Sequence, residues 1–343
     1  MNLAHRGINY RIESDYWYTD DTDTVRQDLI AIRDRLYCNA VNMYGRDVRQ
    51  LTAAARVALE LGLEVWLQPR LPDAPPADVL AHLRETAHAA EQLRQEHPAV
   101  VLNVGCEYSL YTGGIIPGGT AAEKGFPLES PRWWALLPLF NRRLNVFLGQ
   151  AAAVARAGFH GRITYASGFW EKVDWTAFDI VGVNYYRHRH NHAGYRAGLR
   201  RQHRHGKPVV ILEFGCGSYV GADDDGPATH GIVDWHTDPP RVRPGFTRDE
   251  HTQARYLSEL LGIYRDEDVT GAFVFEFADR TRLHSRRAAR DLDMAGYAIT
   301  KVTERSGQQW APKAAFHEIA RIYGAQRDSE PSRQRDGRAP AGK

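Results

Sequence analysis

The sequence of 343 residues is poor in cysteine, has no long apolar run and carries no large excess of charge of either sign. Its three cysteines, Cys38, Cys106 and Cys216, are too few for a disulfide framework, which favours a reducing compartment. No apolar run approaches the roughly 20 residues that span a bilayer, so we expect no contact with a membrane. The first residues also lack the apolar core of a secretory signal, and we therefore predict a cytoplasmic protein.

The charge balance and the glycine pattern exclude two further classes of protein. There are 44 lysine and arginine residues and 42 aspartate and glutamate residues, which gives a formal net charge of +2. This balance provides no overall field that would attract nucleic acid, so any basic patch must be local. The sequence contains no P-loop and no convincing dinucleotide-binding fingerprint. We therefore expect a small-molecule substrate, no nucleotide cofactor and no nucleic-acid partner.

Short apolar runs recur along the chain, and segments with helical spacing of apolar residues separate most of them. The eight runs cover residues 3–10, 39–44, 64–69, 99–107, 162–167, 179–186, 209–215 and 271–277. Strands that alternate with helices in this way predict a (β/α)8 TIM barrel, whose active site lies at the C-terminal ends of the strands. We assign residues 1–325 to this single domain and expect the polar segment 326–343 to be a disordered tail.

Two of the predicted strands end on a glutamate. Glu107 ends the fourth run and Glu213 lies near the end of the seventh, and in a barrel of eight strands these ends face each other across the mouth. Glycoside hydrolysis requires two opposed carboxyl groups: one protonates the leaving oxygen, and the other attacks the anomeric carbon or activates water. The alternative is that one or both glutamates only form ion pairs at the rim of the barrel.

This arrangement resembles the clan A glycoside hydrolases, which have an acid/base glutamate after strand four, a nucleophilic glutamate after strand seven and a tyrosine at the end of strand six. The resemblance covers the barrel portion, from about residue 3 to residue 323. It implies a retaining enzyme that acts on a small glycoside, with Glu107 as the acid/base and Glu213 as the nucleophile. Tyr185 or Tyr186 would then donate a hydrogen bond to the nucleophile.

Two positions depart from the pattern of that clan. The residue before the acid/base glutamate is usually an asparagine that contacts the sugar 2-hydroxyl, and here it is Cys106, a much weaker hydrogen-bonding group. Strand eight commonly supplies a tryptophan, and here the residues are Phe275, Glu276 and Phe277. These departures motivate a second hypothesis, in which the barrel performs other acid/base chemistry on a small metabolite.

Four segments of the chain also resemble uncharacterised bacterial proteins that often carry the label abortive-infection protein. The segments are residues 6–10, 63–66, 271–275 and 292–297. This label implies no defined chemistry. A third hypothesis is therefore a non-catalytic binding or phage-defence protein.

Five further side chains are candidates for the substrate site. Glu276 could bind a substrate hydroxyl or amine, or it could pair with an arginine. Arg70 could bind a substrate carboxylate or hold the fourth-strand glutamate ionised, and the second role is slightly favoured because rim Arg–Glu pairs are common. Trp170, Tyr44 and Tyr108 could form an aromatic wall for a sugar ring, although packing under a loop is favoured for any single one.

The most basic tract, residues 187–207, begins directly after the sixth strand. Its alternating histidines His188, His190 and His192 could bind a metal only from an extended backbone, and the neighbouring arginines oppose a cation, so we expect no metal site. The tract is most simply a solvated surface. The sharper alternative is that it binds an anionic substrate such as a uronic acid or a phosphorylated sugar.

Overall fold

Eight parallel strands form the centre of the fold, and they coincide with the apolar runs of the sequence. The computed structural model describes residues 2–12, 22–121, 123–125, 131–304 and 309–329. The barrel strands are β1 (His5–Ile12), β2 (Ala40–Gly45), β3 (Glu64–Pro69), β4 (Val100–Cys106), β5 (Arg162–Ala166), β6 (Val181–Asn184), β7 (Val209–Phe214) and β10 (Gly271–Val274). Nearly all of their residues are buried, as expected for parallel strands covered by helices.

The strands follow one another in the order β5-β4-β3-β2-β1-β10-β7-β6, and each pairs in parallel with its neighbours. Backbone hydrogen bonds close the remaining gap between β5 and β6. Asp179 N donates to Ile163 O at 3.0 Å, and Asn184 N donates to Ser167 O at 2.8 Å. The result is a nearly closed TIM barrel, which confirms the fold predicted from the sequence.

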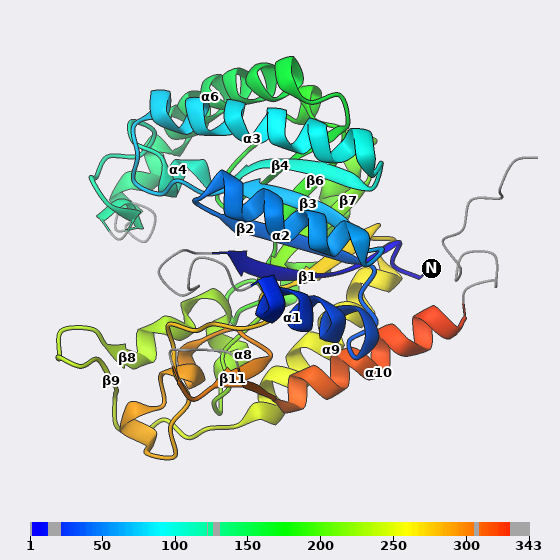
Figure 1. The fold of residues 1–343 in the computed structure, drawn as a ribbon. Coiled ribbons are helices and arrows are strands. Elements are labelled where there is room, and N and C mark those ends of the chain that lie inside the picture. Colours follow the sequence, from blue (N-terminus) through cyan, green and yellow to red (C-terminus); the bar gives the residue numbers. More distant parts are fainter. Residues whose placement is uncertain (1, 13–21, 122, 126–130, 305–308, 330–343) are drawn as a thin grey trace, which may run out of the picture.

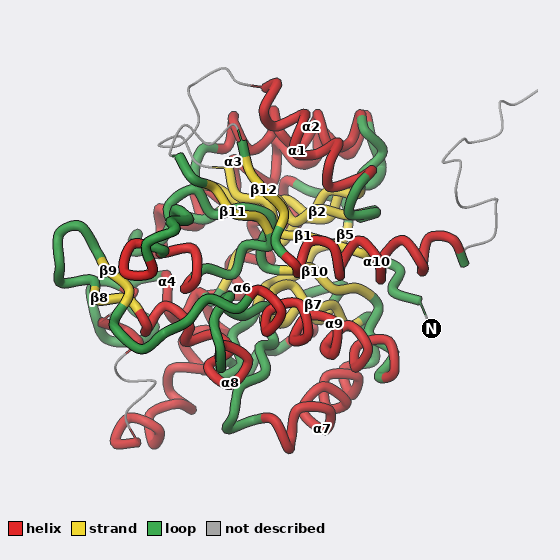
Figure 2. Tube along the Cα trace, turned by 90° about the horizontal axis from the view of Figure 1, so that it is seen from below, coloured by secondary structure: helices red, strands yellow, loops and turns green. Residues whose placement is uncertain are grey.

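Helices cover the outside of the barrel (Figure 1), and Figure 2 shows the strands in the middle with helices on both sides of them. The long helices are α1 (Thr22–Asp34), α2 (Val48–Glu60), α3 (Pro76–Glu96), α6 (Leu137–Gly158), α9 (Glu250–Asp266) and α10 (Ala314–Asp328). The connection from β5 to β6 has only a 3₁₀ turn, Trp175–Ala177, and the short α7 (Tyr195–Arg200) precedes β7. No helix in the described ranges is long and apolar enough to cross a membrane.

The C-terminal helix is longer than the sequence analysis anticipates. Because α10 continues to Asp328, the first three residues assigned to the polar tail are helical. The remainder of that predicted tail, residues 330–343, lies outside the described residues.

The side chains inside the barrel change from aromatic to polar along the barrel axis. At the N-terminal end the rings of Trp66 and Phe273 pack with their centroids 4.9 Å apart. Above them lies a layer of buried amides, in which Asn42 Nδ2 donates to Asn9 Oδ1 at 2.6 Å and to Gln68 Oε1 at 2.9 Å. These hydrogen bonds, and the one from Asn9 Nδ2 to the Leu212 carbonyl at 2.8 Å, offset much of the cost of burying the amides, although Gln68 Nε2 has no partner among the described residues.

A buried carboxylate ties the last part of the chain to the first helix. Asp28 of α1 accepts hydrogen bonds of 2.8 Å from Tyr10 Oη, from Arg280 Nη2 and from Trp310 Nε1. These partners come from β1, from the loop after β10 and from β12 (Trp310–Pro312), which pairs with β11 (Thr300–Val302). Asp28 and Arg280 are only 1% and 7% exposed, so their charges compensate each other away from water.

We expect Asp28→Ala to lower the free energy of unfolding by about 3–5 kcal/mol, because it leaves the buried Arg280 without this carboxylate. Urea denaturation followed by tryptophan fluorescence measures the effect. Asp34→Ala is the matched control, since Asp34 is an exposed carboxylate of the same helix that pairs with Arg33, and it should cost no more than about 0.5 kcal/mol. Equal effects of the two substitutions would contradict the prediction.

Candidate active site

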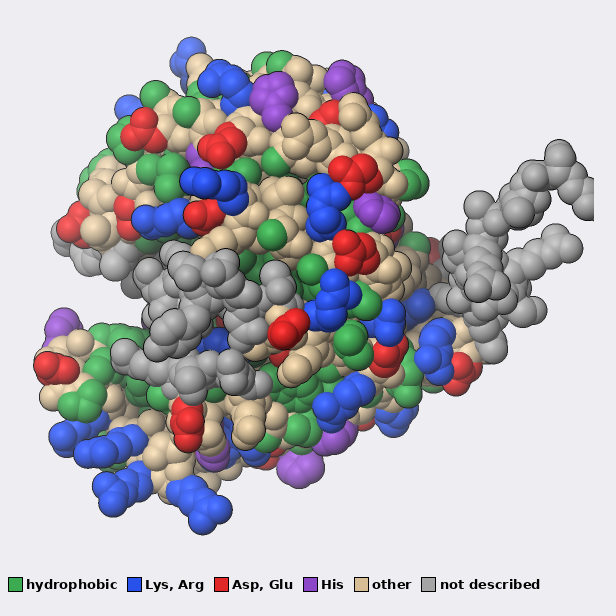
Figure 3. Space-filling view, in the orientation of Figure 1, with side chains coloured by type: hydrophobic (Ala, Val, Ile, Leu, Met, Phe, Trp, Pro, Cys, Tyr) green, Lys and Arg blue, Asp and Glu red, His purple; other side chains and the backbone are tan. Residues whose placement is uncertain are grey.

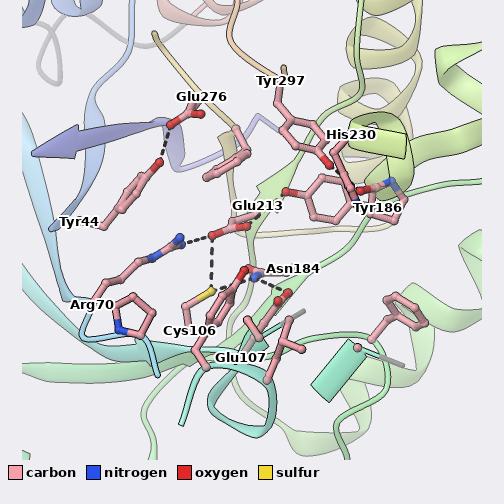
Figure 4. A pocket seen from close by; sticks show the side chains of 18 of the residues that line it. Tyr44, Arg70, Cys106, Glu107, Asn184, Tyr186, Glu213, His230, Glu276 and Tyr297 are labelled. Carbon is pink, nitrogen blue, oxygen red and sulfur yellow. Dashed lines mark hydrogen bonds and ion pairs between the residues drawn. The ribbon is translucent and has the colours of Figure 1, made fainter. Parts of the chain in front are cut away.

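The C-terminal ends of the barrel strands surround a cavity of about 1230 Å³. This volume exceeds the roughly 300–1,000 Å³ of a typical small-molecule site. Side chains from β4, β6, β7 and the loops that follow the strands line it, and Figure 4 shows those at its base. Both glutamates predicted from the sequence, Glu107 and Glu213, are among them.

Glu213 lies on β7, one residue before the strand ends, and it is 6% exposed. Its Oε1 forms an ion pair with Arg70, and its Oε2 accepts a hydrogen bond of 3.2 Å from Tyr186 Oη. The thiol of Cys106 lies 3.6 Å from Oε1, within the range for a weak S–H donor. Each of these contacts stabilises a negative charge on Glu213.

Glu107 follows β4 directly and precedes the short helix α4 (Tyr108–Tyr111). Its backbone has φ +43° and ψ +50°, a left-handed conformation that costs a residue with a Cβ roughly 1–2 kcal/mol. The amide of Asn184 on β6 donates a hydrogen bond of 3.0 Å to Glu107 Oε1. The strained turn directs this carboxyl into the cavity toward Asn184 (Figure 4).

Burial raises the pKa of Glu107 to about 8, and the nearby charge of Glu213 contributes in the same direction. The hydrogen bond from Asn184 opposes both effects, because it favours the ionised carboxylate. At neutral pH Glu107 therefore holds a proton that it can donate. The site thus contains one carboxyl group that keeps its proton at neutral pH and a second that contacts an arginine and a tyrosine.

Cys106 and Asn184 connect the two carboxyl groups. Asn184 Nδ2, which bonds Glu107, also lies 3.3 Å from Cys106 Sγ, and that sulfur lies next to Glu213. Asn184 is 1% exposed, and its Oδ1 has no hydrogen-bond partner in the described part of the chain. The sequence analysis missed Asn184, although it shares the signal that identified both glutamates, a polar residue at the end of an apolar run.

The structure distinguishes between the two tyrosines at the end of β6. Tyr186 donates to Glu213, as the resemblance implies for one of the pair. Tyr185 instead donates to the carbonyl of Tyr195 at 3.0 Å, and its ring packs on that residue at a centroid distance of 4.5 Å. Because consecutive residues point to opposite sides of an extended backbone, only one tyrosine can face the cavity. A role for Tyr185 at the nucleophile is therefore wrong.

Arg70 pairs with a different glutamate from the one that the sequence analysis favours. Its guanidinium pairs with Glu213 instead of holding Glu107 ionised, and it stacks 4.1 Å from the ring centroid of Tyr44. The alternative role for Arg70 is to bind a substrate carboxylate. Its guanidinium is already paired with Glu213 in the structure. The physical reason is the barrel geometry, since Arg70 extends from the end of β3 across the mouth to β7.

Glu276 lies just beyond β10, after a cis peptide bond that joins it to Phe275, and it is 2% exposed. The hydroxyl of Tyr44 donates a hydrogen bond to it. Burial and the charge of Asp279 raise the pKa of Glu276 to about 7. Both Glu276 and Tyr44 border the cavity, so each remains a candidate substrate contact.

The other two aromatic candidates, Trp170 and Tyr108, differ in the contacts that they make within the protein. Trp170 borders the cavity, where its Nε1 donates to Ser109 Oγ at 2.9 Å. Tyr108 also borders the cavity, but its ring packs against Phe147 and Tyr165 at centroid distances of 4.9 and 5.3 Å. The hydroxyl of Tyr108 donates a hydrogen bond to the carbonyl of Val104 on β4. Tyr108 therefore supports the cavity from below, while Trp170 belongs to its wall.

The basic tract is largely occupied by contacts within the protein. Arg196 and Arg200 form ion pairs with Glu267, and Lys207 donates to backbone carbonyls around residue 176. Its first residues, 188–190, border the cavity. Most of the tract thus cannot serve as an anion site.

One group of three side chains in the described ranges has the spacing of metal ligands, His284, Asp291 and Asp293. The guanidinium of Arg248 already lies 2.9 Å from both aspartates, and the buried ammonium of Lys313 lies 2.8 Å from Asp293. These protein cations compensate the carboxylates, so the donor set does not fit a metal ion.

The fold and the paired glutamates define the class of structure to which this chain is similar. A GH113 β-1,4-mannanase shares 15% sequence identity and superimposes with a TM-score of 0.61, over 95% of this chain and 100% of the mannanase. The GH113 β-mannanase from Alicyclobacillus acidocaldarius gives 17% identity and a TM-score of 0.60, over 95% and 98% of the two chains. β-Glucuronidase 2 from Bacteroides uniformis gives 15% and 0.60, over 96% of this chain and 35% of that enzyme.

These similarities establish the TIM-barrel fold and a structural resemblance to clan A glycoside hydrolases at low sequence identity. The sequence matches no protein-family model, and no curated protein matches it. The resemblance to proteins labelled abortive-infection finds no support in these comparisons.

We expect Glu213→Gln to lower the pKa of Glu107, because it removes a neighbouring negative charge and leaves the positive charge of Arg70 unpaired by Glu213. Asn184→Ala should raise the same pKa, because it removes a donor to the ionised form. Infrared titration of the carboxyl band, assigned by difference from Glu107→Gln, measures both shifts. Glu60→Gln, on the outer face of α2, should leave the pKa unchanged. An unchanged pKa in Glu213→Gln would show that the two carboxyl groups are not coupled.

Proposed function

We propose that this protein is a retaining glycoside hydrolase that uses Glu107 as acid/base and Glu213 as nucleophile. The observation that carries the proposal is the pair of carboxyl groups with opposite environments in one cavity. A retaining glycosidase needs this asymmetry, because one group must donate a proton while the other attacks as an anion.

In the first step Glu213 attacks the anomeric carbon and forms a glycosyl ester, while Glu107 transfers its proton to the leaving oxygen. The ester carries no charge, so the repulsion that raised the pKa of Glu107 disappears. Glu107 is then an anion with a lower pKa, ready to take a proton from water in the second step. That water attacks the anomeric carbon, releases the sugar and restores Glu213.

The neighbours of the two glutamates have roles in this cycle. Tyr186 and Arg70 hold Glu213 in the orientation for attack and compensate its charge before the ester forms. Asn184 holds Oε1 of Glu107, which leaves Oε2 to face the leaving group. The Oδ1 atom of Asn184 is an acceptor for a sugar hydroxyl that enters the cavity.

The alternative of other acid/base chemistry draws on the Arg70–Glu213 ion pair, since a paired carboxylate is a weaker nucleophile. The alternative of a non-catalytic binding protein is less favoured, because Glu107 has no direct ion-pair partner in the described residues and an open cavity lies beside both groups. A covalent glycosyl ester on Glu213 separates the first alternative from the proposal.

On the 4-nitrophenyl mannoside, glucuronide or galacturonide that is turned over, Glu213→Gln and Glu107→Gln should each lower kcat by about 10³-fold or more. Glu60→Gln is the matched control and should retain full activity. A 2-fluoro glycosyl fluoride of the same sugar should add one glycosyl group to Glu213, detected by mass spectrometry of peptides. Full activity in either glutamine variant would refute the assignment.

The pH profile provides an independent check. Because the acid form of Glu107 is present below its pKa of about 8, kcat/KM should fall as the pH rises above about 8. In Asn184→Ala the alkaline limb should move to higher pH, since the raised pKa keeps the proton on Glu107 longer. If the alkaline limb stays at the same pH in Asn184→Ala, the hydrogen bond from Asn184 does not determine the pKa of Glu107.

A further inference from the structure

A cluster of arginines lies on the loops that follow β7 and β10. Its members come from the hairpin of β8 (Val233–Asp234) and β9 (Arg241–Val242) and from the segment around the 3₁₀ helix η6 (Ala288–Arg290). We name it the rim arginine cluster; it consists of Arg241, Arg243, Arg286, Arg287 and Arg290. All five residues are exposed, and β9 lies against η6, so they share one surface.

The positive charge of this cluster is not compensated. None of its side chains forms a hydrogen bond or an ion pair within the described residues. The acidic residues of the hairpin itself are Asp234 and Asp238, too few to balance five arginines. In Figure 3 blue side chains gather at the lower left, where Figure 1 places β8 and β9. An unpaired group of like charges attracts anions to this part of the surface.

The cluster adjoins the candidate active site. Arg282 and His230 border the cavity, and Trp235, in the loop of the hairpin that also carries Arg241 and Arg243, contacts both of them. The indole Nε1 of Trp235 donates to the His230 carbonyl at 3.2 Å, and the Arg282 guanidinium lies 5.9 Å from its ring. Trp235 is 47% exposed, so it presents an open aromatic face beside two residues that border the cavity.

We propose that the rim arginine cluster binds the acidic part of a glycan whose end occupies the cavity, so that the substrate is an acidic oligosaccharide or polysaccharide. The inference rests on the proposed function, because it assigns a substrate class to the same cavity. Exposed guanidinium groups bind carboxylate or sulfate groups of successive sugars, and the ring of Trp235 provides a face against which a sugar stacks.

Position favours a glycan over a nucleic acid. The arginines lie on the loops after β7 and β10, which contribute other residues to the cavity lining, and the formal net charge of the chain is only +2. Nucleic-acid-binding domains usually carry a strongly basic face that follows a longer backbone. A glycan that extends from the cavity across these loops contacts both Trp235 and the rim arginine cluster.

The test is binding of a fluorescently labelled oligogalacturonide to the Glu213→Gln protein, measured by anisotropy at low and physiological salt. We expect tighter binding than for a neutral manno-oligosaccharide of equal length, and weaker binding at higher salt. The triple variant R286Q/R287Q/R290Q should lose roughly tenfold in affinity. The control variant R49Q/R84Q/R142Q removes the same charge from exposed positions on α2, α3 and α6 and should bind as before.

Three outcomes overturn the inference: equal affinity for the neutral oligosaccharide, equal losses in the two triple variants, or tighter binding of single-stranded DNA that the cluster variant abolishes. The last would identify a nucleic acid as the partner. Because binding is measured without turnover, the two proposals fail separately. A chain that cleaves glycosides but shows no cluster-dependent binding refutes only the cluster, and one that binds through the cluster but cleaves nothing refutes only the hydrolase.

Discussion

The burial of Glu107 beside a second carboxyl group, Glu213, is the constraint on which the chemistry of the cavity depends. Because burial and the charge of Glu213 both oppose the ionisation of Glu107, the proton of the pair is held at Glu107. Arg70 and Tyr186 contact Glu213, whereas the raised pKa of Glu107 keeps its proton at neutral pH, and this is the division of roles between the two groups. Every other polar group at the base of the cavity adjusts this division or orients one of its partners.

The barrel makes that division possible because its interior is layered. The packed rings of Trp66 and Phe273 fill the N-terminal end, and hydrogen-bonded amides such as Asn42 fill the middle. The carboxyl groups of the candidate site lie beyond these layers, where the strands end and where the cavity begins. The carboxyl groups therefore rest on a support that is rigid and polar but carries no charge of its own to disturb them.

The sequence predicts the eight strands and the positions of both glutamates well, because each strand is a local apolar run and each glutamate interrupts one. It does not predict partners that depend on the third dimension. Arg70 reaches across the mouth to Glu213, and Tyr185 and Tyr186 face opposite ways because of a strand register that the residue pattern leaves open. The rim arginine cluster could not be predicted from the sequence either, because only the structure shows which basic side chains have ion-pair partners among the described residues.

The left-handed backbone at Glu107 places a conformational cost on a residue of the candidate active site. Glycine adopts this conformation without strain, so a sequence selected for stability alone would favour glycine at position 107. A glutamate there combines an unfavourable backbone with an unfavourable burial of its acid group. Stability and activity thus oppose each other at one residue, and screening for more stable variants would tend to remove the carboxyl group first.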